Sequence, residues 1–267
     1  MWKNIGKAGI WFAIYFGLQN IISTILAGVV ILQNIASMPD IAEAEAFLDF
    51  IINAVTTTAV PALAISGVLM IIIYGIYRKK THQSLDVQKL DWRKVILFIG
   101  FGFVLNMVTS LGVGIVSEML PSSWTDSLTQ SVDLVTTGNF WLILLTTGII
   151  VPIMEEITFR YGMHGSIAKS NVVWAYLISA VVFGLMHGNP IQIMYATLMG
   201  VVLSFVYEKT KNICYPMIIH MAVNSSSVSS MLFESEAAFV GSVIGAGTVL
   251  LIAGIVLCKN NAKNQAI

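Results

Sequence analysis

The chain has 267 residues, of which 57% are hydrophobic and only 10% are charged, and its mean hydropathy is +0.83. Soluble domains carry about 25% charged residues, so this composition excludes an ordinary soluble protein and predicts an all-α polytopic membrane protein. The formal net charge is zero, which gives no indication of a nucleic-acid partner. The two cysteines, Cys214 and Cys258, are far apart and predict neither a disulfide framework nor a metal site.

The apolar runs define the elements in chain order, because a membrane-spanning helix needs about 20 apolar residues. We expect the first run to be a retained helix rather than a cleaved leader. The fifth and sixth runs are short and are separated only by Gly188, Asn189 and Pro190, which favour a tight turn. We expect a single transmembrane domain over 1–267, with eight helices. The predicted spans are 8–35, 54–77, 95–117, 139–162, 172–187, 191–207, 212–230 and 238–258.

The distribution of charge predicts the orientation of these spans. All 14 basic residues lie near the two termini or in alternate connections, which places them on one side of the membrane. Basic residues favour the cytoplasmic side, so both termini should be cytoplasmic, and an even number of spans agrees. We expect the protein to reside in a bacterial cell membrane. The opposite loops contain no basic residue and carry Asp40, Glu43, Glu45, Asp49, Glu118, Asp126, Asp133, Glu234 and Glu236.

The fourth run contains ionisable residues at Glu155, Glu156 and Arg160. Charges at membrane depth are costly, by a contested few to ten or more kcal/mol each, and they usually mark a functional site. Residues four apart share a helix face, so we expect Glu156 to pair with Arg160. Glu155 lies about 100° round the helix from Glu156, so its side chain can point in a different direction.

Further polar residues lie in the fifth and seventh runs, at His187, His220 and Asn224. With a rise of about 1.5 Å per residue, Glu155 and Asn224 lie about 20 Å from the cytoplasmic helix ends, and His220 lies about 14 Å from them. These depths are compatible with one cavity. His187, at about 24 Å, is expected near the outer interface.

Three short motifs follow one another on separate apolar segments: Glu-Glu-x-x-x-Arg at 155–160, Phe-x-x-x-His at 183–187 and His-x-x-x-Asn at 220–224. The ordered set resembles the CPBP or Abi family of intramembrane proteases, which includes CAAX-type prenyl proteases and a bacteriocin-processing group. Each motif alone is weak, whereas the three in this order are specific. The resemblance covers about 140–228, the expected catalytic-motif core of spans four to seven.

The resemblance implies a glutamate-type endopeptidase that needs no cofactor, opens toward the cytoplasm and cleaves membrane-associated or hydrophobic peptides or proteins. Glu155 would activate a water molecule that His187 holds, because a carboxylate in an apolar cavity is a good proton acceptor. His220 and Asn224 would donate hydrogen bonds to the oxyanion. The expected supporting residues are Glu156, Arg160 and Phe183.

Alternatives remain open at this stage. Glu155, His187 and His220 would also suit zinc as an alternative cofactor, although the helical zinc motif His-Glu-x-x-His is absent. A non-enzymatic role, as a bacteriocin self-immunity factor or a scaffold for a membrane sensor or exporter partner, is the alternative function. A small-solute transporter would explain buried charges too, but no inverted repeat is visible.

Overall fold

The computed structural model describes residues 1–41, 43–81, 90–233 and 235–265. Every regular element within them is helical, which confirms the all-α prediction. The helices outside the fourth span are α1 (Trp2–Gln33), η1 (Ile35–Ser37), α2 (Ala44–Lys80), α3 (Trp92–Ser117), α4 (Ser122–Thr136), α8 (Val172–Leu185), α9 (Pro190–Thr210), α10 (Cys214–Ser229), η4 (Ser230–Leu232) and α11 (Glu236–Gln265). The fourth span runs without interruption through α5 (Phe140–Ile143), η2 (Leu144–Ile150), α6 (Val151–Glu156), η3 (Ile157–His164) and α7 (Gly165–Ile167).

Six of the described helices are long and apolar enough to cross a membrane, by length and composition. They are α1, α2, α3, the composite helix 140–167, α9 and residues Ala237–Lys259 of α11, so the protein is a multi-pass integral membrane protein. Helices α8 and α10 coincide with the fifth and seventh predicted spans but have only 14 and 16 residues. The predicted total of eight spans is therefore not confirmed.

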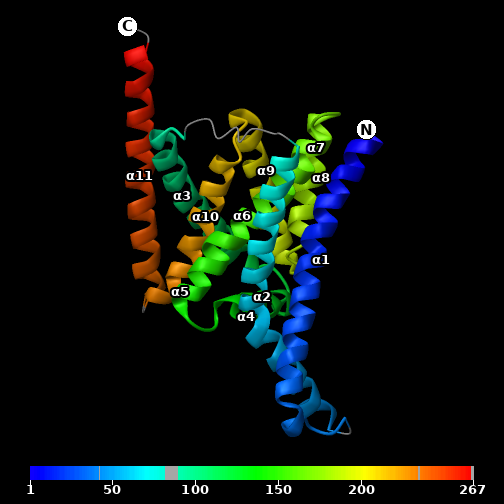
Figure 1. Cartoon of the computed structure of the whole chain (residues 1–267). Coiled ribbons are helices and arrows are strands. Elements are labelled where there is room, and N and C mark those ends of the chain that lie inside the picture. Colours follow the sequence, from blue (N-terminus) through cyan, green and yellow to red (C-terminus); the bar gives the residue numbers. More distant parts are fainter. Residues whose placement is uncertain (42, 82–89, 234, 266–267) are drawn as a thin grey trace.

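The start of α1 and the last turns of α11 lie at the same end of the bundle (Figure 1). The end of α2, the start of α3 and α7 lie at this end as well. The basic residues Arg78, Lys79 and Lys80 close α2, and Arg93 and Lys94 open α3, so charge and architecture agree. We call this the basic end and the opposite one the acidic end. Of the predicted loop charges, Lys89 and Glu234 lie outside the described residues.

Helix α4 was not predicted, because its sequence has too few apolar residues to span a membrane. It is amphipathic, and its partly exposed apolar face includes Leu128, Val132 and Val135. It contacts α2 and α9 at the acidic end (Figure 1). The side-chain amide of Asn189 donates a hydrogen bond to the backbone oxygen of Trp124 at 3.0 Å and fixes α4 to the start of α9.

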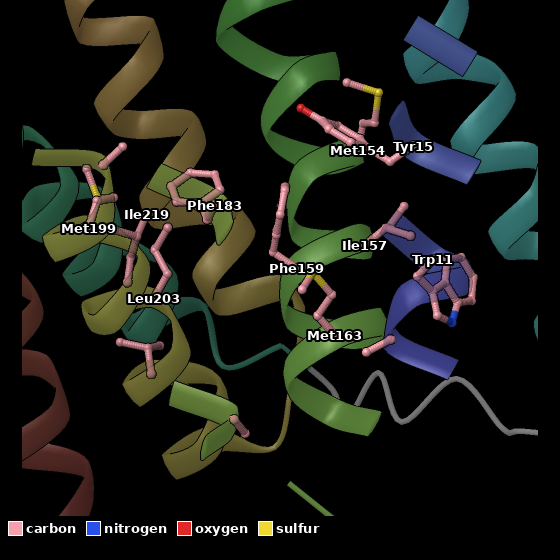
Figure 2. Close-up of a cluster of buried hydrophobic side chains, with 14 of the residues drawn as sticks. Trp11, Tyr15, Met154, Ile157, Phe159, Met163, Phe183, Met199, Leu203 and Ile219 are labelled. Atoms are coloured by element: carbon pink, nitrogen blue, oxygen red, sulfur yellow. The ribbon is translucent and has the colours of Figure 1, made fainter. Parts of the chain in front are cut away.

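The main hydrophobic core joins α1, the middle of the fourth span and helices α8 to α10 (Figure 2). Phe159 and Met163 project from η3 into this core and are 0% and 4% exposed. Ile219 of α10 and Leu203 of α9 are both 0% exposed and belong to the same cluster. The fourth span is thereby enclosed by its neighbours, which explains how it can carry charged residues.

Candidate active site

The two adjacent carboxylates meet the same histidine. Nδ1 of His220 lies 2.8 Å from Oε1 of Glu156, and Nε2 of the same ring lies 3.5 Å from Oε2 of Glu155. Glu155 and Glu156 are 7% and 0% exposed, and His220 is 4% exposed. A hydrogen bond to Glu156 makes Nδ1 the protonated nitrogen and directs Nε2 toward Glu155. The sequence suggested neither contact, because i,i+4 spacing relates Glu156 to Arg160 alone.

The expected ion pair of the fourth span is present. Nε of Arg160 lies 3.1 Å from Oε2 of Glu156, and both side chains are essentially inaccessible. The guanidinium nitrogens have no aligned hydrogen-bond partner in the described structure, so the attraction to Glu156 is mainly Coulombic. The guanidinium carbon also lies 4.5 Å from the centre of the Phe183 ring, a cation–π contact. Phe183 thus packs beside the site and helps to balance a buried charge.

Tyr15 is a site residue that sequence reasoning missed. Its hydroxyl donates a hydrogen bond to Oε1 of Glu155 at 3.3 Å, and the side chain is 3% exposed. Its ring packs edge-on against Phe159, with 5.4 Å between the ring centres. A tyrosine in an apolar first helix carries no signal of this contact, since 140 residues separate it from its partner.

His187 lies in the same region but does not bond to Glu155. Its Nδ1 is 3.0 Å from the backbone oxygen of Phe183, one turn earlier. Its ring packs edge-on against Phe183, which in turn contacts His220 edge-on at 5.7 Å. Phe183 therefore separates the two imidazoles, and Nε2 of His187 is the nitrogen that remains for a water or a substrate.

Asn224 repairs a break in the fourth span. In η2 the N–H of Val151 bonds the carbonyl of Thr146, five residues earlier. By the same register the carbonyl of Thr147 would accept from residue 152, which is proline and has no N–H. The side-chain amide of Asn224 donates to that carbonyl instead, at 3.0 Å. A break in a buried helix is tolerated where a neighbouring helix supplies the missing donor, and this one lies three residues before Glu155.

All four predicted catalytic side chains line one cavity of about 820 Å³. Glu155 reaches it from α6, His187 from the turn after α8, His220 and Asn224 from α10, and Tyr15 from α1. Its size is in the range of about 300–1,000 Å³ that is typical of ligand pockets. The geometry combines a buried carboxylate, an adjacent imidazole and amide donors, which are the groups that hydrolysis of a carbonyl compound needs.

A metal ion is less well accommodated. Among the described residues, no three His, Cys, Asp or Glu side chains form a group that could hold a metal ion. Glu155, His187 and His220, the alternative zinc ligands, therefore do not form such a group, and Nδ1 of His187 lies 3.0 Å from the backbone oxygen of Phe183.

Comparison with known proteins places these motifs in a family. Residues 137–226 match the family model for the type II CAAX prenyl endopeptidase Rce1-like proteins, and this segment contains all three motifs. The chain is also 30% identical over 149 residues to the UPF0177 protein YxdF of Lactococcus lactis, which covers 55% of this chain and 80% of YxdF. The chain belongs to the Rce1-like CAAX protease family. The resemblance drawn from the motifs is thereby confirmed.

Two further relatives of this Rce1-like chain have descriptive names. It is 36% identical over 92 residues to "Putative membrane peptidase YdiL" of Bacillus subtilis, a match that spans 34% of this chain and 38% of YdiL. It is 28% identical over 166 residues to the membrane-embedded CAAX protease MroQ of Staphylococcus aureus, which covers 59% of this chain and 67% of MroQ. No solved structure matches the chain significantly. Helices α1 to α4 lie outside the segment that the family model matches.

Proposed function

We propose that the protein is an intramembrane endopeptidase of the glutamate type, acting on hydrophobic or membrane-associated peptides or proteins. The observation that supports this most is the environment of Glu155. It is a buried carboxylate that lines a cavity and, within the described part of the chain, pairs with no lysine or arginine, whereas the neighbouring Glu156 is bound to Arg160. The relatives named as a membrane peptidase and as a CAAX protease support hydrolysis as the reaction.

In the proposed mechanism Glu155 takes a proton from a water molecule as the oxygen attacks the peptide carbonyl carbon. The hydroxyl of Tyr15 donates a hydrogen bond to Oε1 of Glu155 and so orients this carboxylate. The negative charge that develops on the carbonyl oxygen is met by donors in the cavity. When the C–N bond breaks, Glu155 returns its proton to the leaving nitrogen, so the net reaction is hydrolysis.

The donors are assigned to His220 and Asn224. Nε2 of His220 faces Glu155 at 3.5 Å, donates to the oxyanion while it carries the proton relayed from that carboxylate, and gives this proton back to Glu155 before the C–N bond breaks. The amide of Asn224 has two N–H groups, of which one bonds Thr147 and the other remains for the oxyanion. His187 uses Nε2 to hold the attacking water. Glu156 fixes the ring of His220 and so acts as a positioning residue.

The decisive experiment compares peptide termini in cells that carry the wild-type protein or Glu155→Gln at matched abundance. The amide cannot accept the proton, so we expect termini that appear with the wild type and disappear with the variant. Glu208→Gln serves as the control, because Glu208 bonds His164 and Lys211 outside the cavity and the same chemical change there should leave the termini unchanged.

Substantial cleavage by Glu155→Gln would remove Glu155 from the role of base. Identical termini in both strains, together with equal rescue of a deletion phenotype, would favour a membrane scaffold or immunity factor instead.

A further inference from the structure

The cavity lies in only one half of the bundle. On α1 it is lined by Tyr15 near the middle of the helix and by Gln19 and Ser23 in the half nearer the acidic end. On α3 it is lined by residues between 106 and 113, which also lie in the half nearer the acidic end. Glu155 lies at its inner limit. At the opposite end of the cavity, which we call its mouth, α4 contributes residues between 128 and 136, and η4 contributes Ser230 and Met231. The cavity therefore extends from Glu155 toward α4 and away from the chain termini.

The other half of the bundle is filled. Beyond Glu155 toward the basic end, Ile157, Phe159, Arg160, Met163 and Ile167 are all at most 4% exposed. The hydrophobic core surrounds them with side chains of α1 and α9 (Figure 2). No residue of η3 or α7 lines the cavity. A substrate that approaches from the basic end thus meets a packed core. The geometry differs from the cytoplasmic opening that the resemblance implied.

Charge identifies the two sides. Within the described ranges, every lysine and arginine except Arg160 belongs to the basic end, which predicts that this end is cytoplasmic. The charged residues that the structure describes at the acidic end are all acidic, and two of them, Asp126 and Asp133, are exposed on α4, which lines the mouth. A rim of one sign attracts segments of the opposite sign.

We infer that the substrate enters from the outer side of the membrane, as an apolar peptide segment flanked by basic residues. The inference rests on the proposed function for its chemistry, but the route is a separate property. Leu128, Val132 and Val135 of α4 offer apolar contacts at the mouth, while Ser131 and Thr136 offer hydroxyls to the backbone of an extended chain. Exported peptides fit this description, because a basic flank that has reached the outer side of the membrane can contact the acidic residues of α4.

The route is tested by thiol labelling of intact cells. The two native cysteines are first replaced, as Cys214→Ser and Cys258→Ser, and a single cysteine is then introduced as Ser131→Cys or Lys169→Cys. Lys169 is exposed next to α7 at the basic end. A membrane-impermeant maleimide should label Ser131→Cys in intact cells and Lys169→Cys only after permeabilisation. The reverse pattern would overturn the inference.

The substrate class is tested by protection of the same cysteine. Two synthetic peptides share a Leu-Ala segment and carry either four lysines or four glutamates at one end. At low salt, the lysine peptide should slow labelling of Ser131→Cys roughly tenfold more than the glutamate peptide does. A factor of about ten is the lower limit of the rate enhancement that electrostatic steering gives. Asp126→Asn with Asp133→Asn should remove this difference, whereas Glu45→Gln with Asp49→Asn, on the same side but at the start of α2 rather than on α4, should preserve it.

Carrying out the protection measurement in Glu155→Gln separates the two proposals. Protection without any cleavage by the wild type would leave the route intact and refute the peptidase. If the wild type cleaves but the two peptides protect Ser131→Cys equally, or neither protects it, the proposed entry of basic segments from the outer side is refuted. The peptidase proposal then stands.

Discussion

The buried triad of His220, Glu156 and Arg160 gives the sharpest quantitative prediction. Glu156 is the only carboxylate that neutralises Arg160 by direct ion pairing among the described residues, and both side chains are essentially inaccessible. In Glu156→Gln the guanidinium stays buried without a counter-charge and retains mainly its contact with the Phe183 ring. Removing one partner of a buried pair costs about 3–5 kcal/mol, so we expect a loss of this size in the free energy of unfolding.

The second variant of this test is Glu156→Gln combined with Arg160→Met. It removes both charges and replaces the guanidinium with an apolar side chain that fills irregular space, which should recover most of the lost stability. It does not restore the carboxylate that holds Nδ1 of His220. We therefore expect the double variant to be stable but still defective in cleavage.

The stability is measured in detergent, by heating or by titration with denaturant. The activity is measured by the appearance of the peptide termini that depend on Glu155. A single variant that loses less than about 1 kcal/mol would refute the buried-pair argument, since surface pairs contribute only that much. A stable double variant with full activity would refute the positioning of His220 by Glu156.

Three further predictions follow from the cavity. Asn224→Ala should lower stability by about 1–3 kcal/mol because the carbonyl of Thr147 loses its donor, and adding Pro152→Ala should restore much of it by supplying a backbone N–H; no recovery in thermal unfolding would contradict the helix-break account. Tyr15→Phe should slow cleavage about tenfold, since a long hydrogen bond to a charged group contributes about 1.5 kcal/mol, while abundance stays normal. Chelators should leave cleavage by the purified protein largely intact, and a loss that added zinc restores would favour a metal-dependent reaction.

The sequence was sufficient for properties that depend on local composition. Among the described residues, hydropathy located every helix that has the length and apolarity of a membrane span, because a helix that satisfies its own backbone in lipid also needs a continuous apolar run. The i,i+4 spacing predicted the pair of Glu156 and Arg160, and the ordered motifs predicted the family. Helix α4 escaped prediction because its amphipathic face is too short and too polar to register as a span.

Only the tertiary structure decided how the site is assembled. The contacts of His220 with two carboxylates, of Tyr15 with Glu155 and of Asn224 with Thr147 join segments between 64 and 140 residues apart. Such contacts depend on the rotation and depth of neighbouring helices, which no local pattern encodes. The same is true of the cavity, since packing fills the half toward the basic end and leaves the half toward α4 open. The sequence determined which groups are buried and which side of the membrane carries the basic charge, and helix packing determined which groups meet and from which side they are reached.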